Sequence, residues 1–424
     1  MKAGYNHATV AVVDAFSSGA YFPPALRCRG IDVVHVRTAC EPVPGMPCAE
    51  QGDFIECIDA REGLAGVVRR LDELRVSHVL AGAETGSSLA DELALALGVA
   101  TANACAWPGA RQDKRAMHRC LDAAGIPIPW QIHFDERGEQ VWNTPGPMPR
   151  KLVVKPAASG GSDHVMVCDD AEAARRAAAT ILANRNVFGA ANCGVVVQGF
   201  LAGDEYAVNT VSVGGRHHFR EIWKSVKSQI QGATNGRVIY DRQILEDASA
   251  EPMAPIRDYV ARVLDALGVR WGASHTEIIV TEQGPRILET ATRPAGGMDP
   301  CLSLRVFGRS YIDEVVDAYL IPEWARARRS AEALNMHAMG VSLISGVEGR
   351  LWRDIDVEPI RGLASYHGHR MALRKGDRLL PTVDLGSKPG GVYLCHASRE
   401  QIEADVLAIR SWERDEFARC IQAH

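Results

Sequence analysis

Two apolar segments, SHTEIIV and RILETATR, are separated by a short turn at 282–284, and each carries one glutamate. The pattern predicts two antiparallel strands of one hairpin, with Glu277 and Glu289 in apolar surroundings. Two such carboxylates repel one another unless a cation lies between them. Mg²⁺ is usually held by few carboxylates, with phosphates and water completing its shell. The pair is therefore a candidate magnesium site, although an ordinary hairpin with one hydrogen-bonded and one surface glutamate explains the same residues.

The length and charge of the chain limit the classes of protein to consider. With 424 residues it is too long for one simple core and predicts roughly two to four domains. The net charge of -5 gives no basic surface for nucleic acid. No apolar run approaches the roughly 20 residues that span a membrane. We therefore expect small molecules as partners, and neither nucleic acid nor membrane.

The cysteine pattern favours a reducing compartment. The 11 cysteines are scattered, and no CxxC pair occurs in the sequence. Such usage is typical of buried free thiols rather than of zinc ribbons or redox motifs. The first segment, MKAGYNHATVAVV, has the pattern of a β-strand rather than of a signal peptide. We expect a cytoplasmic protein.

The N-terminal part alternates between apolar strands and helical segments, which predicts a parallel sheet in an α/β domain. The turn after the first strand lacks GxGxxG, so the dinucleotide fingerprint is absent. Gly82, Glu84 and Gly86 follow the third strand and are candidates to line a ligand crevice, but turn chemistry is the simpler explanation. Strands are expected at 8–14, 31–37 and 76–82.

A lysine and a small-residue loop suggest an anion site. Lys155 ends the expected strand KLVVKP, and the run SGGS follows it. Small residues let backbone N–H groups approach an anion, and a nest of such groups binds phosphate. The loop is not a Walker A motif, and an ordinary turn with a surface lysine is the alternative. The loop residues are Ser159, Gly160, Gly161 and Ser162.

The order of these features along the chain is more specific than any one of them. Lys114 begins a helix, Lys155 and its loop come next, then QGFL at 198–201, then Glu205, then the two glutamates and Arg293. This order resembles that of the ATP-grasp superfamily over nearly the whole chain. The resemblance implies an α/β fold with a Rossmann-like parallel-sheet domain, a small α+β lid and a large antiparallel-sheet domain. Their expected ranges are 1–112, 113–200 and 201–424.

The resemblance also implies a role for each of these positions. ATP lies between the lid and the large domain, and Mg²⁺, with Mn²⁺ as the alternative, is held by the two glutamates. The SGGS loop belongs to the nucleotide site, and relatives are often homodimers. The family often has Asn two residues after the second metal ligand, where this chain has Ala291, so we expect the two glutamates to hold the metal as a pair. The implied contacts are phosphates for Lys114 and Lys155, adenine for the backbone of Gln198, Gly199, Phe200 and Leu201, ribose for Glu205, and metal for Glu277 and Glu289.

Within the superfamily, several stretches are similar to the L-amino acid ligases, notably His-Thr-Glu at 275–277 and Arg-Pro-Ala-Gly-Gly at 293–297. These carboxylate–amine ligases phosphorylate an acid with ATP and release ADP, and an amine then attacks the acyl phosphate. We expect this chain to join two amino acids, with Lys155, Glu289 and Arg293 as catalytic residues. Arg293 is a fixed donor for the oxyanion of the tetrahedral intermediate. His275 orients substrate, assists proton removal or is structural.

Several alternatives remain open from the sequence. Gly296 and Gly297 leave room for a substrate side chain or serve a turn. The polar segment 228–240 is a candidate loop over the acceptor site. The acid could instead be a dicarboxylate or its monoamide, joined to a diamino acid in antibiotic biosynthesis. A non-catalytic nucleotide-binding protein is the third possibility, although the lysines, glutamates and arginine occur together.

Overall fold

Among the residues that it describes, the computed structural model has four β-sheets, one of which is parallel, as the sequence predicts for the N-terminal part. In the described part of the chain, no helix has both the length and the apolar character needed to cross a membrane. The structure describes residues 8–42, 46–103, 106–107, 109–229, 238–297, 299–321, 323, 327–383 and 386–421.

The N-terminal sheet has its strands in the order β3-β2-β1-β4. Its strand β1 (Thr9–Val13) is a continuous apolar run that is buried along its whole length. Such a run is typical of a parallel strand that is covered on both faces of its sheet. The other elements are β2 Asp32–Arg37, β3 Glu56–Asp59 and β4 Val76–Ala81, with helices α1 Phe22–Arg27, α2 Leu64–Glu73 and α3 Ser87–Ala96.

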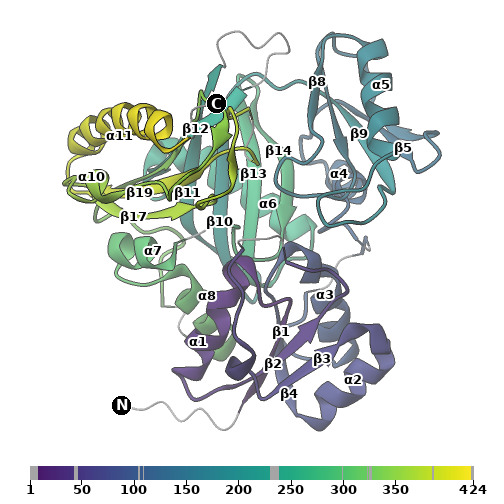
Figure 1. Ribbon diagram of the computed structural model, residues 1–424. Coiled ribbons are helices and arrows are strands. Elements are labelled where there is room, and N and C mark those ends of the chain that lie inside the picture. Colours follow the sequence, from purple (N-terminus) through teal and green to yellow (C-terminus); the bar gives the residue numbers. More distant parts are fainter. Residues whose placement is uncertain are drawn as a thin grey trace.

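A five-stranded antiparallel sheet in the order β6-β5-β9-β7-β8 follows in the chain. The alanine-rich helix α5 covers one face of this sheet and begins at the capping residue Asp170. Figure 1 shows this group in teal, apart from the purple N-terminal sheet. Its elements are α4 Lys114–Ala123, β5 Gln131–Asp135, β6 Gln140–Asn143, β7 Leu152–Pro156, β8 Met166–Cys168, α5 Ala171–Leu182 and β9 Gly194–Gly199.

The largest sheet has eight antiparallel strands in the order β14-β13-β10-β11-β12-β15-β19-β17. The predicted hairpin at 282–284 is present in it, and a second hairpin turns at Gly214. Its strands are β10 Asp204–Val213, β11 Arg216–Gln229, β12 Val238–Glu246, β13 Trp271–Thr281, β14 Gly284–Ala291, β15 His337–Ser342, β17 Tyr366–Met371 and β19 Gly390–His396. The pair β16 Gly349–Arg350 and β18 Arg378–Leu379 forms a separate small sheet.

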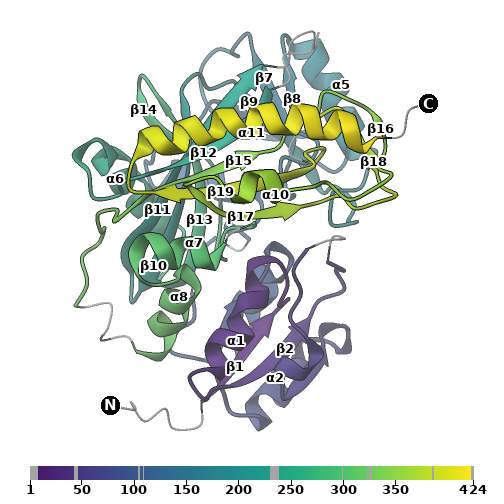
Figure 2. The ribbon, with the colours of Figure 1, turned by 60° about the vertical axis from the view of Figure 1, so that its left-hand side comes forward.

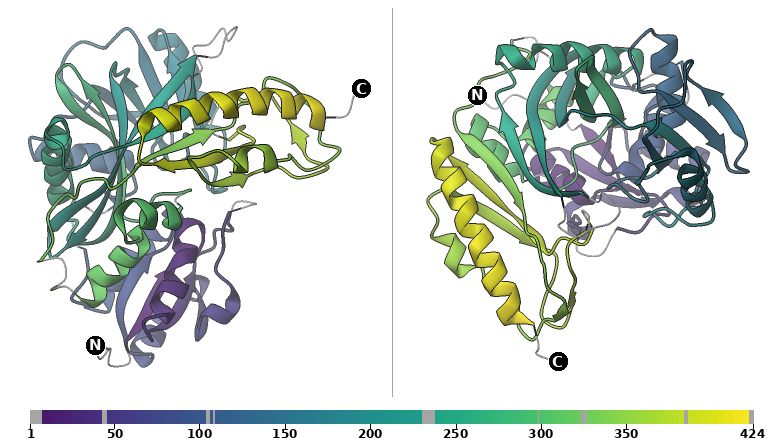
Figure 3. Two further views of the ribbon diagram at one scale, coloured as in Figure 1. Left: turned by 90° about the vertical axis from the view of Figure 1, so that its left-hand side faces the viewer. Right: turned by 90° about the horizontal axis from the view of Figure 1, so that it is seen from above.

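Helices cover the large sheet on several sides. The helix α6 packs with α4 on β10, β13 and β14, while α8 lies between the N-terminal sheet and strands β10 and β13. The long helix α11 lies along β15 and β19 (Figure 2), and Figure 3 shows it on the opposite side of the molecule from α5. The helices are α6 Ala254–Ala266, α7 Pro300–Phe307, α8 Tyr311–Leu320, α10 Glu358–Arg361 and α11 Arg399–Cys420.

The division of the chain at residues 112 and 200 stays a prediction. The side chains of Met117 and Leu121 on α4 belong to the apolar cluster of α6, although they follow the first predicted boundary. The helix α4 therefore connects the small antiparallel sheet to the large one.

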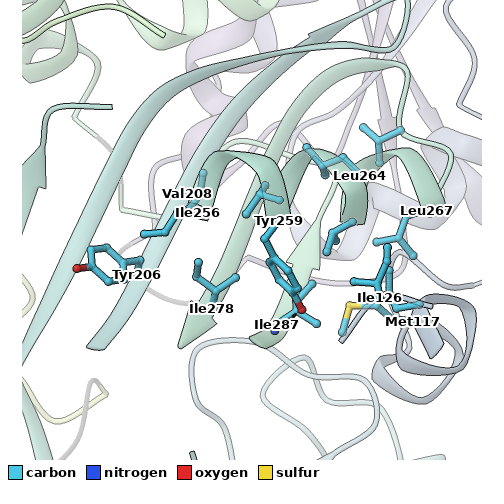
Figure 4. Close-up of a cluster of buried hydrophobic side chains, with 14 of the residues drawn as sticks. Met117, Ile126, Tyr206, Val208, Ile256, Tyr259, Leu264, Leu267, Ile278 and Ile287 are labelled. Atoms are coloured by element: carbon cyan, nitrogen blue, oxygen red, sulfur yellow. Dashed lines mark hydrogen bonds between the residues drawn. The ribbon is translucent and has the colours of Figure 1, made fainter. Parts of the chain in front are cut away.

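Tyr259 on α6 ties this cluster to the strand that carries Glu289. Its hydroxyl donates to the carbonyl of Pro127 at 2.7 Å and accepts from the backbone N–H of Ile287 at 2.9 Å. Burial raises the pKa of Tyr259 to about 12, so the hydroxyl stays protonated at neutral pH. Figure 4 shows the ring between α6 and the side chains of Ile278 and Ile287.

We expect Tyr259→Phe to lower the free energy of unfolding by about 1–3 kcal/mol, because the buried N–H of Ile287 loses its acceptor and the carbonyl of Pro127 loses its donor. Urea unfolding followed by circular dichroism measures this change. Tyr206→Phe is the matched control, since the partner of the Tyr206 hydroxyl is the half-exposed Lys224. Equal stability of the two variants would contradict the prediction.

Candidate active site

The two glutamates lie directly opposite one another on adjacent strands. Glu277 of β13 and Glu289 of β14 are Cα partners, and a register shift follows Glu277. Both side chains are half-buried. Their neighbours Thr276 and Thr290 are buried and share a hydrogen bond of 2.7 Å on the other face of the hairpin. Strand alternation therefore places both carboxylates together on the open face.

Lys114 connects this hairpin to the small-residue loop after β7. Its Nζ lies 2.7 Å from Oε2 of Glu289 and donates to the carbonyl of Ser159 at 3.0 Å. Burial favours the neutral form of Glu289, but the charge of Lys114, with those of Lys155 and Arg293, lowers the pKa of Glu289 to about 2. The carboxylate is therefore ionised at neutral pH and available to a cation.

Lys155 lies in the same buried region at the end of β7. Its Nζ donates to the carbonyl of Leu288 at 3.2 Å. Burial and the neighbouring Lys114 lower the pKa of Lys155 to about 8, although Glu289 and Glu277 oppose the shift. An incoming anion would relieve the repulsion between the two lysines.

This pKa predicts a pH dependence of nucleotide binding. Lys155 is cationic below pH 8 and becomes neutral above it, so the Kd for ATP should rise by about tenfold per pH unit above 8 until the pKa of the complex is reached. Titrations of ATP between pH 7 and pH 9.5 measure this. Lys155→Arg keeps its charge over the range and should flatten the dependence. A flat profile for the unchanged protein would contradict the assignment.

His275 connects Glu277 to a buried polar chain. Its Nε2 lies 3.3 Å from Oε1 of Glu277, and its Nδ1 lies 2.8 Å from Oδ1 of Asn209. Asn209 Nδ2 donates to Oε2 of Glu221 at 2.7 Å, and Trp223 Nε1 donates to the same oxygen at 3.0 Å. Asn209 and Glu221 were not expected from the sequence, where polar residues inside the apolar runs of β10 and β11 were their only signal.

Glu277 and Glu289 offer a pair of hard oxygen donors, which suits Mg²⁺. The structure describes no group of three or more His, Cys, Asp or Glu side chains that could hold a metal ion. Two carboxylates with phosphates and water make a common magnesium site. Glu289 is paired with Lys114, and Glu277 with His275, so a cation would share these carboxylates with their present partners.

The small-residue loop has the backbone of a tight turn. Gly161 and Ser162 have φ of 66° and 61°, and a Cβ on Gly160 would lie 3.1 Å from the ring of Phe188. The Ser159 hydroxyl donates to Asp163 at 2.7 Å. Space is therefore tight at Gly160 but open at Gly161, and Asp163 is an acidic neighbour that the phosphate hypothesis did not include.

The hinge run 198–201 offers fewer free backbone groups than expected. Gly199 N–H donates to Trp130 at 2.7 Å, and Phe200 N–H donates to Lys151 at 2.9 Å. The side chain of Gln198, on β9 of the five-stranded sheet, is buried, and its Nε2 lies 3.5 Å from Nε2 of His118. In the part of the chain that the structure describes, the N–H of Leu201 has no hydrogen-bond partner. Among the three N–H groups of 199–201, that of Leu201 is therefore the one left without a partner in the described part of the chain.

Glu205 is engaged by two side chains. Tyr240 donates to its Oε1 at 2.9 Å, and Lys227 forms an ion pair with its Oε2. Burial raises the pKa of Glu205, which Lys227 opposes. A ribose hydroxyl would have to share or displace one of these partners. The segment 230–237, part of the candidate acceptor loop, lies outside the described residues.

Arg293 contacts Glu84, which lies in the turn after β4 of the N-terminal sheet. Its Nε donates to Oε2 of Glu84 at 2.7 Å, and its Nη2 lies 2.6 Å from the same oxygen. Gly296 and Gly297 are exposed. Gly297 has φ of 70°, the left-handed conformation that favours glycine in a turn, and its carbonyl accepts from the Tyr393 hydroxyl at 2.7 Å. Glu84 was assigned to turn chemistry, and its 209-residue separation from Arg293 hid the pair.

A small pocket collects the central parts of this arrangement. The ammonium of Lys114 and three carboxylates, those of Glu84, Asp113 and Glu289, lie around it, a donor set that suits a small cation. The lining residues are Glu84, Gln112, Asp113, Lys114, Met117, Glu289, Thr290 and Ala291.

A protein-family model, a relative and several solved structures are similar to this chain. The family model of the ATP-grasp domain matches residues 148–301. Dapdiamide A synthase of Enterobacter agglomerans is 30% identical over 431 residues, covering 97% of each protein. The L-amino acid ligase of Bacillus licheniformis has a TM-score of 0.72 at 19% identity, covering 96% of this chain and 98% of that one. N5-carboxyaminoimidazole synthetase of Staphylococcus aureus, complexed with ADP, has a TM-score of 0.63 at 14% identity over 96% and 98% of the two chains.

Proposed function

Because the chain belongs to the ATP-grasp family of carboxylate–amine ligases, we propose that it joins the carboxylate of one amino acid to the amine of another. ATP would phosphorylate the acid and leave as ADP, and the amine would displace phosphate. The observation that carries the proposal is the meeting of Lys114, Lys155, Glu277, Glu289 and Arg293 from three parts of the chain. Each of these five affects the charge state of another member of the set.

The proposed chemistry needs positioning and charge neutralisation more than a protein nucleophile. In the first step, a carboxylate oxygen attacks the γ-phosphorus and the bond to ADP breaks. Lys114 and Lys155 would offset phosphate charge, and Glu277 and Glu289 would hold Mg²⁺. Bound Mg²⁺ would neutralise charge on the phosphate oxygens.

The second step transfers the acyl group to nitrogen. The amine attacks the acyl carbon, the carbonyl oxygen becomes an oxyanion, phosphate leaves, and the nitrogen loses a proton. Arg293 would donate to that oxyanion. The predicted lid, residues 113–200, would exclude water from the acyl phosphate.

A product assay tests the proposal. The protein is incubated with ATP, Mg²⁺ and the twenty L-amino acids in pairs, and a new amide with one ADP per bond is the expected result. Formation of AMP would contradict the acyl-phosphate route. Absence of any nucleotide product with every acid would leave the non-catalytic alternative.

The similarity to dapdiamide A synthase favours a second candidate reaction. In it, the acid is a dicarboxylate or its monoamide and the amine belongs to a diamino acid, in natural-product biosynthesis. The same assay with fumarate, its monoamide and 2,3-diaminopropionate distinguishes the two. Product only from this second panel would replace the first candidate.

Three further properties belong to the proposal. We propose the domain ranges 1–112, 113–200 and 201–424, a cytoplasmic location and a homodimer. Free cysteines support the location, since the structure forms no disulfide among the cysteines it describes. Size-exclusion chromatography with light scattering tests the dimer.

A further inference from the structure

The N-terminal sheet contributes a carboxylate to the guanidinium of Arg293. Glu84 lies in a short turn, Glu84–Gly86, directly after β4. Arg293 Nε and Nη2 both contact Oε2 of Glu84, while Nη1 donates to the carbonyl of Pro294 at 2.9 Å. The arginine side chain is 14% exposed. A guanidinium has five N–H groups, so Nη1 and Nη2 each keep one donor for another acceptor.

The turn that carries Glu84 is held rigidly against β1. Gly82 N–H donates to the carbonyl of Val13 at 2.8 Å. A Cβ on Gly82 would lie 2.4 Å from the backbone oxygen of Asp14, and one on Gly86 would lie 2.7 Å from that of Val13. Only glycine fits such close backbone contact. The glycines therefore do serve turn chemistry, and the turn they build presents Glu84 to Arg293.

Asp14 anchors the same turn by its side chain. It is fully buried and accepts from the Thr85 hydroxyl at 2.5 Å and from the N–H and hydroxyl of Thr38 at 2.9 and 2.8 Å. A second contact joins the same two regions, since the Ser18 hydroxyl donates to the carbonyl of Ala295. The segment after Arg293 is thus fixed to the N-terminal sheet at two points.

We propose that Glu84 is a positioning residue for the amide-forming step, holding Arg293 so that its free Nη1 and Nη2 donors meet the oxyanion of the tetrahedral adduct. This inference rests on the proposed ligase function. Two charge-assisted contacts, from Nε and Nη2 to one carboxylate oxygen, fix the plane of the guanidinium as well as its position. Glu289 and Glu277 both raise the pKa of Arg293, so the guanidinium lies within electrostatic range of the carboxylates of the hairpin.

The two chemical steps should depend differently on Glu84. When a carboxylate oxygen attacks the γ-phosphorus, an O–P bond forms and the bond to ADP breaks, without new charge on the acyl oxygen. When the amine attacks, the C=O electron pair moves onto oxygen until the bond to phosphate breaks and the nitrogen loses its proton. Arg293 is needed mainly in the second step, and so is the residue that orients it.

The test compares Glu84→Gln with Glu92→Gln, whose side chain is exposed on the following helix α3. Rapid quench with the productive acid–amine pair separates the first ADP formed from steady-state amide. We expect Glu84→Gln to keep the ADP burst within about twofold while amide turnover falls about 10- to 100-fold, as for other orienting groups. Glu92→Gln should match the unchanged protein in both.

A double variant shows whether Glu84 acts through Arg293. If it does, Glu84→Gln combined with Arg293→Lys should be no slower than Arg293→Lys alone. Additive losses, an equal fall of burst and turnover, or a raised KM for the acid at unchanged kcat would each overturn the inference. These outcomes require an active unchanged protein, so they are distinct from failure of the proposed function, in which no acid–amine pair releases ADP.

Discussion

Replacing Glu289 by glutamine is expected to lower the rate of ADP release by about 10³-fold. The amide keeps the shape of the side chain but removes the charge that would bind the metal, an interaction worth several kcal/mol in the transition state. It also removes the 2.7 Å ion pair with Lys114 and leaves that ammonium uncompensated. A coupled ADP assay at saturating ATP measures the rate, and a Mn²⁺ titration measures the cation affinity independently of turnover.

The exposed Glu282, in the turn of the same hairpin, provides the matched control. Glu282→Gln should leave both the rate and the Mn²⁺ affinity unchanged. Far-ultraviolet circular dichroism establishes that Glu289→Gln is folded at the assay temperature. Undiminished turnover by a folded Glu289→Gln protein would rule out the metal assignment of this residue.

Replacing Arg293 by lysine should reduce amide formation by about 10²–10³-fold, the usual cost of losing one oxyanion donor. Lysine keeps the charge but not the planar fork, so it cannot hold Glu84 with two nitrogens and present further donors at once. The KM for ATP should change little, because the phosphate contacts are assigned to Lys114 and Lys155. Quantifying amide by mass spectrometry, alongside the first-turnover ADP burst measured by rapid quench, separates slow acyl transfer from loss of activation.

Arg305→Lys, on the exposed face of α7, is the control for a general effect of removing a guanidinium. It should be fully active. An Arg293→Lys protein that forms amide at the original rate would show that charge alone suffices and that the fork geometry is irrelevant. A protein that loses ADP formation to the same extent as amide would place Arg293 in the phosphoryl-transfer step instead.

The sequence predicted the local features of this molecule better than its long-range contacts. The two apolar runs SHTEIIV and RILETATR, with the short turn between them, predicted the hairpin of β13 and β14. The parallel N-terminal sheet followed from its βαβ alternation. The ATP-grasp resemblance, which depended on the order of residues rather than on any single one, is confirmed by the family model and the relatives.

The contacts that the sequence did not predict share one physical cause. Glu84 and Arg293 are 209 residues apart, and no pattern within either segment encodes the other. Asn209 and Glu221 bond across adjacent strands, where pairing register decides which polar groups meet. Likewise, the carbonyls of Trp130 and Lys151, which lie far from residue 200 in the sequence, accept the N–H groups of Gly199 and Phe200. Only the folded structure shows which of these distant residues contact one another.

The long sequence separation between paired residues has a consequence for how the enzyme is made. Domains generally fold from the N-terminus onward as the chain emerges from the ribosome. Glu84 and Lys114 are synthesised long before their partners Arg293 and Glu289. We expect nascent chains that end before β14 to lack both pairs, so the ability to consume ATP should arise only late in translation. Stalled chains of increasing length, assayed for ADP release, would show the point at which this ability begins.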